Sequence, residues 1–412
     1  MKIQARLTAV ATVALLGVVL AACGSSGSSA SSSKDGGTIK IGVVLPYSGV
    51  QATIANLESL GVETAVKQIN AAGGIGGKQK IELVKEDDQL NSTRAATVMR
   101  DLDSKGVKLA LGGQTSDLCK AEAEAGNRFN ILFIGAHCTS KQLINPPVTP
   151  NFYMTGQLDT DLTKANGAAL AAQFPNVKSW DVFAYDQTVT RGFWDQTKAA
   201  ITAATGSPVI TNKEVYVPAA ATDLKNQLSA LSSSTTGEKA TRGLFLGVYG
   251  AGTTSFIQQA RPLGLLDNYA VITQTGVYWS TAVSLQGTAP PIYDVHEYFW
   301  SCQKNDMNTT FVNDFKSVAN GQLPDTGAYQ GYVAMQLLAA AIGKAGSSDV
   351  PAVEKAMDGI SVKTPAGLPM TMNGTTHHAD GPITTALLYG DKSAPETVGI
   401  KDCKTVQSSA LK

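Results

Sequence analysis

The chain has 412 residues, of which 43% are hydrophobic and 16% are charged, and its formal net charge is +0. This length suits two domains, or one large body with two lobes, and it provides ample material for buried cores. The balanced charge argues against a nucleic-acid-binding protein, because contacts to phosphates need a basic surface. The composition is that of a globular protein rather than a disordered one.

The first 22 residues have the layout of a secretory signal peptide. Lys2 and Arg6 form a basic start, and residues 7–20 form an uncharged apolar run, shorter than the roughly 20 residues that span a membrane comfortably. Leu-Ala-Ala then precedes Cys23, a pattern that resembles the bacterial lipobox, in which the cysteine is linked to diacylglycerol. The alternative is an incidental cysteine beside a signal remnant. We expect residues 1–22 to be removed and Cys23 to be acylated.

A serine- and glycine-rich stretch follows, and within residues 24–37 the one apolar side chain is Ala30. Such a sequence buries nothing and behaves as a flexible tether with a reach of about 20 Å. Residues 1–37 therefore predict an extracytoplasmic lipoprotein, anchored to the cell membrane through Cys23 and followed by a folded body that begins at residue 38.

The first part of that body alternates apolar strands with helices. Four strands separated by helices predict a parallel, doubly wound sheet. The expected strands cover residues 39–46, 80–87, 107–113 and 131–136, and the expected helices cover residues 53–71, 91–102 and 116–129.

The alternation starts again after Tyr153 and predicts a second sheet of the same kind. The fold class is therefore α/β, with two doubly wound parallel-sheet lobes of Rossmann type and a cleft between them, where small ligands usually bind. Strands are expected at residues 180–186, 214–218, 244–250, 269–276, 293–300 and 383–390, and helices at 162–174, through 194, at 224–231 and 256–263, near 311, and at 332–342 and 353–357.

Three segments, in order and spacing, carry a resemblance to a known family. They are IKIGVVLPYSG, VKQINAAGGIGGKQKIELVKEDDQ and ARPLGL, and they resemble the periplasmic leucine/isoleucine/valine-binding (type I) solute-binding proteins of ABC transporters. The resemblance implies a hinge of three crossings, near residues 154–155, 298–300 and 384–388. The implied lobes are residues 38–155 with 299–384, and residues 156–298 with 385–412.

The resemblance also implies the protein's role and partners. The two lobes would close on a small carboxylate-bearing solute, either a branched-chain or related amino acid or an organic acid, and the closed form would meet the ABC permease subunits in the membrane. We expect a monomer without a cofactor. The alternative is a sensory co-receptor of the same fold that reports a solute to a membrane signalling protein.

The family's ligand contacts fall on four residues of this chain. Ser116 and Thr139 would hold the ligand carboxylate, with a backbone contact at His137 between them and an aromatic contact at Tyr249 in the second lobe. Ser116 lies where a strand gives way to a helix, a position that favours anions because backbone N–H groups are free there. It could equally serve as the helix N-cap, and Tyr249 could be a packed core residue.

Two departures from the family pattern concern charge. Thr275 stands where amino-acid binders place an acidic residue for the ligand ammonium, so either Asp186 or Glu297 serves instead, or the ligand lacks an ammonium. Thr190 and Arg191 replace a tyrosine-glycine pair, and Arg191 could hold a second carboxylate or be solvated. Three aromatic residues are expected at the cleft and would favour an apolar or aromatic solute: Tyr47, Tyr278 and Trp279.

The four cysteines after Cys23 suit two disulfides formed in an oxidising compartment. Three pairings are possible. We favour Cys119–Cys138, because both are expected at neighbouring strand ends of one sheet, which leaves Cys302–Cys403. Unpaired buried thiols are the alternative.

Nothing in the chain indicates an enzyme. It contains no G-x-S-x-G, no G-x-x-x-x-G-K-[ST], no C-x-x-C and no H-E-x-x-H motif. The adjacent His377 and His378 lie in a turn-like stretch, GTTHHADG, which we interpret as a solvated loop rather than a metal site, because sequence neighbours rarely bind one metal together.

Overall fold

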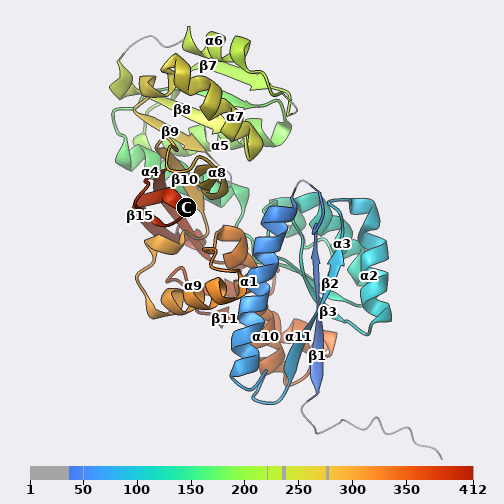
Figure 1. Ribbon diagram of the computed structural model, residues 1–412. Coiled ribbons are helices and arrows are strands. Elements are labelled where there is room, and N and C mark those ends of the chain that lie inside the picture. Colours follow the sequence, from blue (N-terminus) through green and yellow to red (C-terminus); the bar gives the residue numbers. More distant parts are fainter. Residues whose placement is uncertain (1–36, 50, 220, 234–237, 275–277, 412) are drawn as a thin grey trace, which may run out of the picture. The chain divides into compact units, whose positions relative to one another are not determined.

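The computed structural model of the protein describes residues 37–49, 51–219, 221–233, 238–274 and 278–411 (Figure 1). The signal segment, Cys23, the tether before residue 37 and Thr275 lie outside the described residues. Within those residues, no helix has the length and apolar character needed to cross a membrane.

The first sheet has, in the described chain, five strands in the order β2-β1-β3-β4-β5, all parallel. Its first four strands fall where the apolar runs predict them. A short fifth strand pairs with β4 and carries the chain toward the second sheet. The bounds are Thr38–Leu45 for β1, Lys80–Asp87 for β2, Leu109–Gly112 for β3, Leu132–Gly135 for β4 and Phe152–Met154 for β5.

Helices cover both faces of this sheet, because successive side chains of a strand point to opposite faces. Val43 of β1 packs into one core and its neighbour Val44 into the other, and the same alternation separates Leu111 from Ala110 in β3. The first core is closed by α1 (Ala52–Ala71), α9 (Asp306–Val318), α10 (Thr326–Ala345) and α11 (Val350–Met357), and the second by α2 (Ala95–Ser104) and α3 (Ser116–Arg128).

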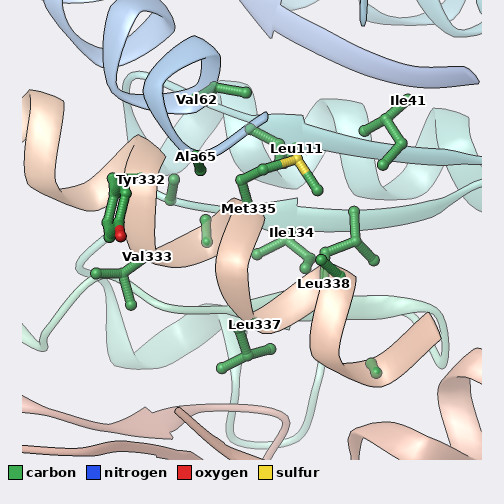
Figure 2. Close-up of a cluster of buried hydrophobic side chains, with 14 of the residues drawn as sticks. Ile41, Val62, Ala65, Leu111, Ile134, Tyr332, Val333, Met335, Leu337 and Leu338 are labelled. Atoms are coloured by element: carbon green, nitrogen blue, oxygen red, sulfur yellow. The ribbon is translucent and has the colours of Figure 1, made fainter. Parts of the chain in front are cut away.

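Helices α1 and α10 approach each other closely over the first sheet. A Cβ atom on Gly61 would overlap the backbone carbonyl of Ala328, and one on Gly331 would overlap the backbone of α1. Figure 2 shows Val62 of α1 and Met335 of α10 in the buried cluster that these helices share with the sheet. Glycine is therefore required at both contact points.

The second sheet is mixed. Within the described residues it has the order β15-β14-β10-β9-β8-β6-β7, in which the strands from β6 to β10 are parallel and β14 pairs antiparallel with both β10 and β15. Phe183 packs into one core and its neighbour Val182 into another, so this sheet is also covered on both faces. Its strands are β6 (Ser179–Tyr185), β7 (Ile210–Val217), β8 (Arg242–Gly247), β9 (Val271–Gln274), β10 (Ile292–His296), β14 (Pro382–Gly390) and β15 (Val398–Gln407), and its helices include α4 (Asp159–Gln173), α5 (Thr188–Thr205), α6 (Lys225–Ser232), α7 (Ala251–Ala260) and α8 (Trp279–Ser284).

The described chain passes between the two sheets three times. The first passage lies between β5 and α4, which packs on β10 and β14, and the second lies between β10 and α9. The third precedes β14, after a small antiparallel sheet of β11 (Ser361–Val362), β12 (Met370–Met372) and β13 (Ala379–Asp380). The expected third crossing at residues 384–388 is wrong, because these residues are already paired with β10 and β15.

Candidate functional site

A cavity of about 470 Å³ is lined by residues that follow strand ends in both sheets. Gln114 follows β3, His137 and Thr139 follow β4, and Tyr249 follows β8. The carboxyl ends of parallel strands meet at one edge of a sheet, where ligands of open α/β folds bind. Asp159 at the start of α4 and Glu297 after β10 add two carboxyl groups to the lining.

The segment after β4 is held by the start of α3. The Ser116 hydroxyl accepts hydrogen bonds from the backbone N–H groups of Thr139 (3.4 Å) and Ser140 (3.2 Å). Ser116 itself is not among the described residues that line the cavity. The N-cap of α3 is its neighbour Thr115, whose side chain accepts from the N–H of Leu118. Ser116 and Thr139 are therefore brought together, but in this structure Ser116 supports the cavity wall.

Thr139 is joined to an acidic residue. The N–H of Asp159 donates to the carbonyl of Thr139 at 3.1 Å. Burial raises the pKa of Asp159, the nearby Thr139 hydroxyl opposes this, and Glu297 raises it further. Asp159 was not singled out from the sequence, where its only distinguishing feature is its position at a helix start, at which acids are common.

Glu297 lies almost fully buried, at 2% exposure, on the cavity wall. One of its oxygens accepts from the backbone N–H of Gln157 (3.0 Å) and from Nε2 of Gln330 (2.9 Å), and the other accepts from the Thr326 hydroxyl (3.0 Å). Carboxylates have about four acceptor positions. Among the described residues, three of these positions on Glu297 accept hydrogen bonds, and the fourth, on the oxygen bonded to Thr326, is free.

The His137 side chain lies among ionisable groups. Its Nδ1 is 3.8 Å from Oε2 of the fully buried Glu58. Burial lowers the pKa of His137, Glu297 opposes this, and His296 lowers it further. Burial raises the pKa of Glu58 well above its ordinary value, and the charges of Asp325, Asp88 and Glu297 add to this. At neutral pH the imidazole is therefore neutral, and it contributes no positive charge to the cavity.

The charge of the described lining is negative. It includes the carboxylates of Asp159 and Glu297 and contains neither lysine nor arginine. The side-chain oxygen of Gln114, a buried residue on the wall, is an acceptor without a hydrogen-bond partner among the described residues. Charges removed from water must be paired to be tolerated. The cavity is therefore suited to a ligand that carries a cationic, hydrogen-bond-donating group.

An apolar wall faces these polar groups. Tyr249 is 42% exposed, so it is not a core residue, and its hydroxyl donates to the side chain of Gln187 at 3.0 Å. The apolar lining residues are Ile54, Leu162, Phe193 and Val295.

Other residues singled out in the sequence do not line this cavity. Asp186 and Arg191 form an exposed ion pair of 2.8 Å with each other, and the Arg191 guanidinium stacks on Tyr216. Tyr278 is fully buried and its hydroxyl donates to the carbonyl of Pro290. Tyr47 lies at the end of β1 with its hydroxyl bonded to Ser59, and Trp279 donates to Glu396.

Both favoured disulfides are present, Cys119–Cys138 and Cys302–Cys403. The reason given for the first pairing is partly wrong. Cys138 does follow the end of β4, but Cys119 lies in the first turn of α3 rather than at a strand end. The helix brings it back over the end of the neighbouring strand.

The adjacent histidines are not a solvated loop. Nδ1 of His377 bonds the carbonyl of Phe152 at 2.9 Å, and its ring stacks on Tyr153. Nε2 of His378 bonds the carbonyl of Gly156 at 3.0 Å, and burial lowers the pKa of His378. The His377 ring packs on β5, and the His378 ring bonds the passage that follows it. Within the described residues, no cluster of His, Cys, Asp or Glu has the arrangement of a metal site.

Three comparisons relate this chain to known proteins. Residues 38–389 match the family model described as periplasmic binding protein. The Leu/Ile/Val-binding protein homolog 1 of Brucella abortus is 26% identical over 323 residues, which cover 77% of this chain and 82% of that protein. The chain therefore belongs to the periplasmic binding protein family, whose members are binding proteins rather than enzymes and act outside the cytoplasm.

Solved structures share the fold. A solute-binding protein from Rhodopseudomonas palustris, in complex with 3,4-dihydroxybenzoic acid, aligns with a TM-score of 0.74 at 19% identity, over 90% of this chain and 98% of that one. A branched-chain amino acid transporter substrate-binding protein from Streptococcus pneumoniae, in complex with isoleucine, aligns with a TM-score of 0.73 at 19% identity, over 90% and 99%. The fold is thus the two-lobed type I periplasmic-binding-protein fold.

Proposed function

We propose that this protein is the solute-binding component of an ABC importer, and that its ligand is an α-amino acid with an apolar side chain. The observation that carries the proposal is the cavity at the strand ends of both sheets, with carboxylates and an apolar wall in its described lining. A Leu/Ile/Val-binding relative and a structural neighbour bound to isoleucine support this ligand class. Another neighbour binds 3,4-dihydroxybenzoic acid, so an aromatic acid is the competing ligand.

The charge of the cavity favours the amino acid. An aromatic acid would bring its carboxylate close to Asp159 and Glu297, with no lysine or arginine in the described lining to balance the three negative charges. An ammonium would instead take the free acceptor position of Glu297 and could also contact Asp159. Like charges close together in a poorly solvated site repel strongly.

The contact between Thr139 and Asp159 fits both polar groups of an α-amino acid. In this structure the Thr139 hydroxyl lies near the carboxylate of Asp159 and lowers its pKa. An ammonium bound at Asp159 would leave that hydroxyl to donate to a carboxylate. The ammonium and the carboxylate of an α-amino acid are attached to the same carbon, so one ligand supplies both at this spacing. Ser116 would support the carboxylate contact by fixing the N–H groups of Thr139 and Ser140.

The test is a calorimetric titration of the purified protein, freed of bound ligand, with leucine. We expect leucine to bind, and the Ser116→Ala/Thr139→Ala variant to bind at least tenfold more weakly, because a hydrogen bond to a charged group contributes about 1.5–3 kcal/mol. Circular dichroism should show that the variant remains folded. A folded double variant with unchanged affinity would remove both residues from the site.

We further propose that the mature protein is held at the membrane by a lipid on Cys23, as the lipobox pattern suggests. The Cys23→Ala variant is expected to lose incorporation of radiolabelled palmitate and to move from the membrane fraction to the soluble fraction. The measurement is fractionation of cells that express the parent or the variant chain. A variant that stays in the membrane fraction would show that the anchor does not depend on Cys23.

A further inference from the structure

The Cys119–Cys138 disulfide lies next to the proposed ligand contacts. Cys138 stands between His137 and Thr139, and both of these line the cavity. Its partner Cys119 belongs to the first turn of α3, which also contains Ser116. Both sulfurs are fully buried. The disulfide therefore joins the cavity wall to the helix that supports it.

The wall segment, residues 136–140, has no helix or strand of its own. It is held at its edges by hydrogen bonds: the Ser116 hydroxyl receives the N–H groups of Thr139 and Ser140, and the carbonyl of Thr139 receives the N–H of Asp159. A segment without a regular backbone ladder has considerable conformational freedom unless other contacts remove it. The disulfide at Cys138 restricts this conformational freedom at the centre of the segment.

We infer that this disulfide is a positioning element of the ligand site, which holds His137 and Thr139 in their binding geometry before the ligand arrives. The inference rests on the proposed function, since it assumes that these residues contact the solute. Its physical basis is preorganisation: a segment that is already ordered loses little further freedom when the ligand binds, so more of the contact energy appears as affinity.

The chain contains a matched control. The second disulfide joins Cys302, which lies in the second passage, to Cys403 in β15. Neither cysteine is among the described residues of the cavity lining. Its two cysteines have a sequence separation of 101, whereas Cys119 and Cys138 have a sequence separation of 19, so the control bond closes a longer loop. In the chain-entropy account, the longer loop constrains the unfolded chain more, so removal of the control disulfide should cost at least as much stability.

The experiment compares the full-length Cys119→Ser/Cys138→Ser and Cys302→Ser/Cys403→Ser variants with the parent, by leucine titration and by thermal unfolding. We expect the first variant to bind leucine about tenfold more weakly, with a less favourable binding entropy, and the second to bind within twofold of the parent although its melting temperature also falls. Equal weakening in both variants, or a folded first variant with parental affinity, would overturn the inference. If the serine pair does not fold, the Cys119→Ala/Cys138→Val variant keeps the buried apolar volume.

A ligand-free measurement separates this inference from the proposed function. Hydrogen exchange of the backbone amides of residues 137–140 should accelerate at least tenfold in the first variant and remain parental in the second. If the parent binds no amino acid but this acceleration is seen, the proposed function fails while the positioning of the segment stands. If the exchange is unchanged, the positioning fails whatever the ligand is.

Discussion

The Glu297→Gln variant is expected to bind leucine about 100-fold more weakly than the parent, because removal of one partner from a buried charge pair costs roughly 2–5 kcal/mol. The substitution changes charge with little change of shape. The amide oxygen can still accept from Gln157 and Gln330, and the amide nitrogen can donate to the Thr326 hydroxyl in place of the oxygen that accepts from it now. What is lost is the negative charge that faces the ligand ammonium.

Two comparisons make this result specific. Glu122→Gln replaces another fully buried glutamate, which is not among the described residues that line the cavity. Burial, together with the neighbouring Asp88, raises the pKa of Glu122 well above its ordinary value. Because Glu122 lies outside the described lining, its variant should bind leucine within twofold of the parent. 4-Methylpentanoate, which is leucine without its ammonium, should bind the parent poorly and gain affinity in Glu297→Gln. Tight binding of 4-methylpentanoate or of 3,4-dihydroxybenzoate to the parent would assign the site to organic acids.

The Gly61→Ala variant is expected to lower the free energy of unfolding by about 3 kcal/mol, the upper part of the range for an overpacked core. The added Cβ would overlap the backbone carbonyl of Ala328, which cannot move as a side chain could. Helices α1 and α10 would have to separate, and they carry Ile54 and Gln330 to the cavity wall. Denaturant titration monitored by circular dichroism measures the change.

Gly343 provides the control for this prediction, because it lies in α10 and is exposed. A Cβ atom there would meet the side chain of Ile75 at an ordinary contact distance of 3.7 Å. Gly343→Ala should therefore stabilise the protein by up to about 1 kcal/mol, since alanine loses less conformational freedom than glycine in a helix. If both variants behave alike, the close approach of α1 and α10 is not what requires glycine at position 61.

Local sequence signals accounted for most of the fold. The apolar runs that became β1, β3 and β4 are short and rich in β-branched or aliphatic residues, and a helical pattern separates each from the next. The glycines in INAAGGIGGKQ ended α1 as predicted, and Gly73 and Gly74 adopt positive φ. These features depend on residues that are close in sequence, so they can be predicted from the sequence alone.

Other elements could not be recognised in this way. Strand β15 carries three charged residues at its exposed centre, residues 401–404, and it forms the edge of the second sheet, where one side is open to solvent. The ring contacts of His377 and His378 join residues separated by more than 220 positions. The turn-like sequence around them predicted that both side chains would be exposed to solvent. Their partners, the carbonyls of Phe152 and Gly156, come close only in the folded chain.

The same distinction between local signals and tertiary contacts applies to the candidate site. The resemblance of the sequence to the family indicated that His137, Thr139 and Tyr249 would contribute to one site, and all three line the cavity. The electrostatic character of the cavity was decided by the tertiary structure. Glu297 acquires its environment from Gln157, 140 positions away, and from Gln330 on α10, and Asp159 meets Thr139 across the first passage. Such contacts depend on how the two sheets and their connections pack together. The spacing of apolar residues along the chain predicts which side chains are buried, but not which residues they contact.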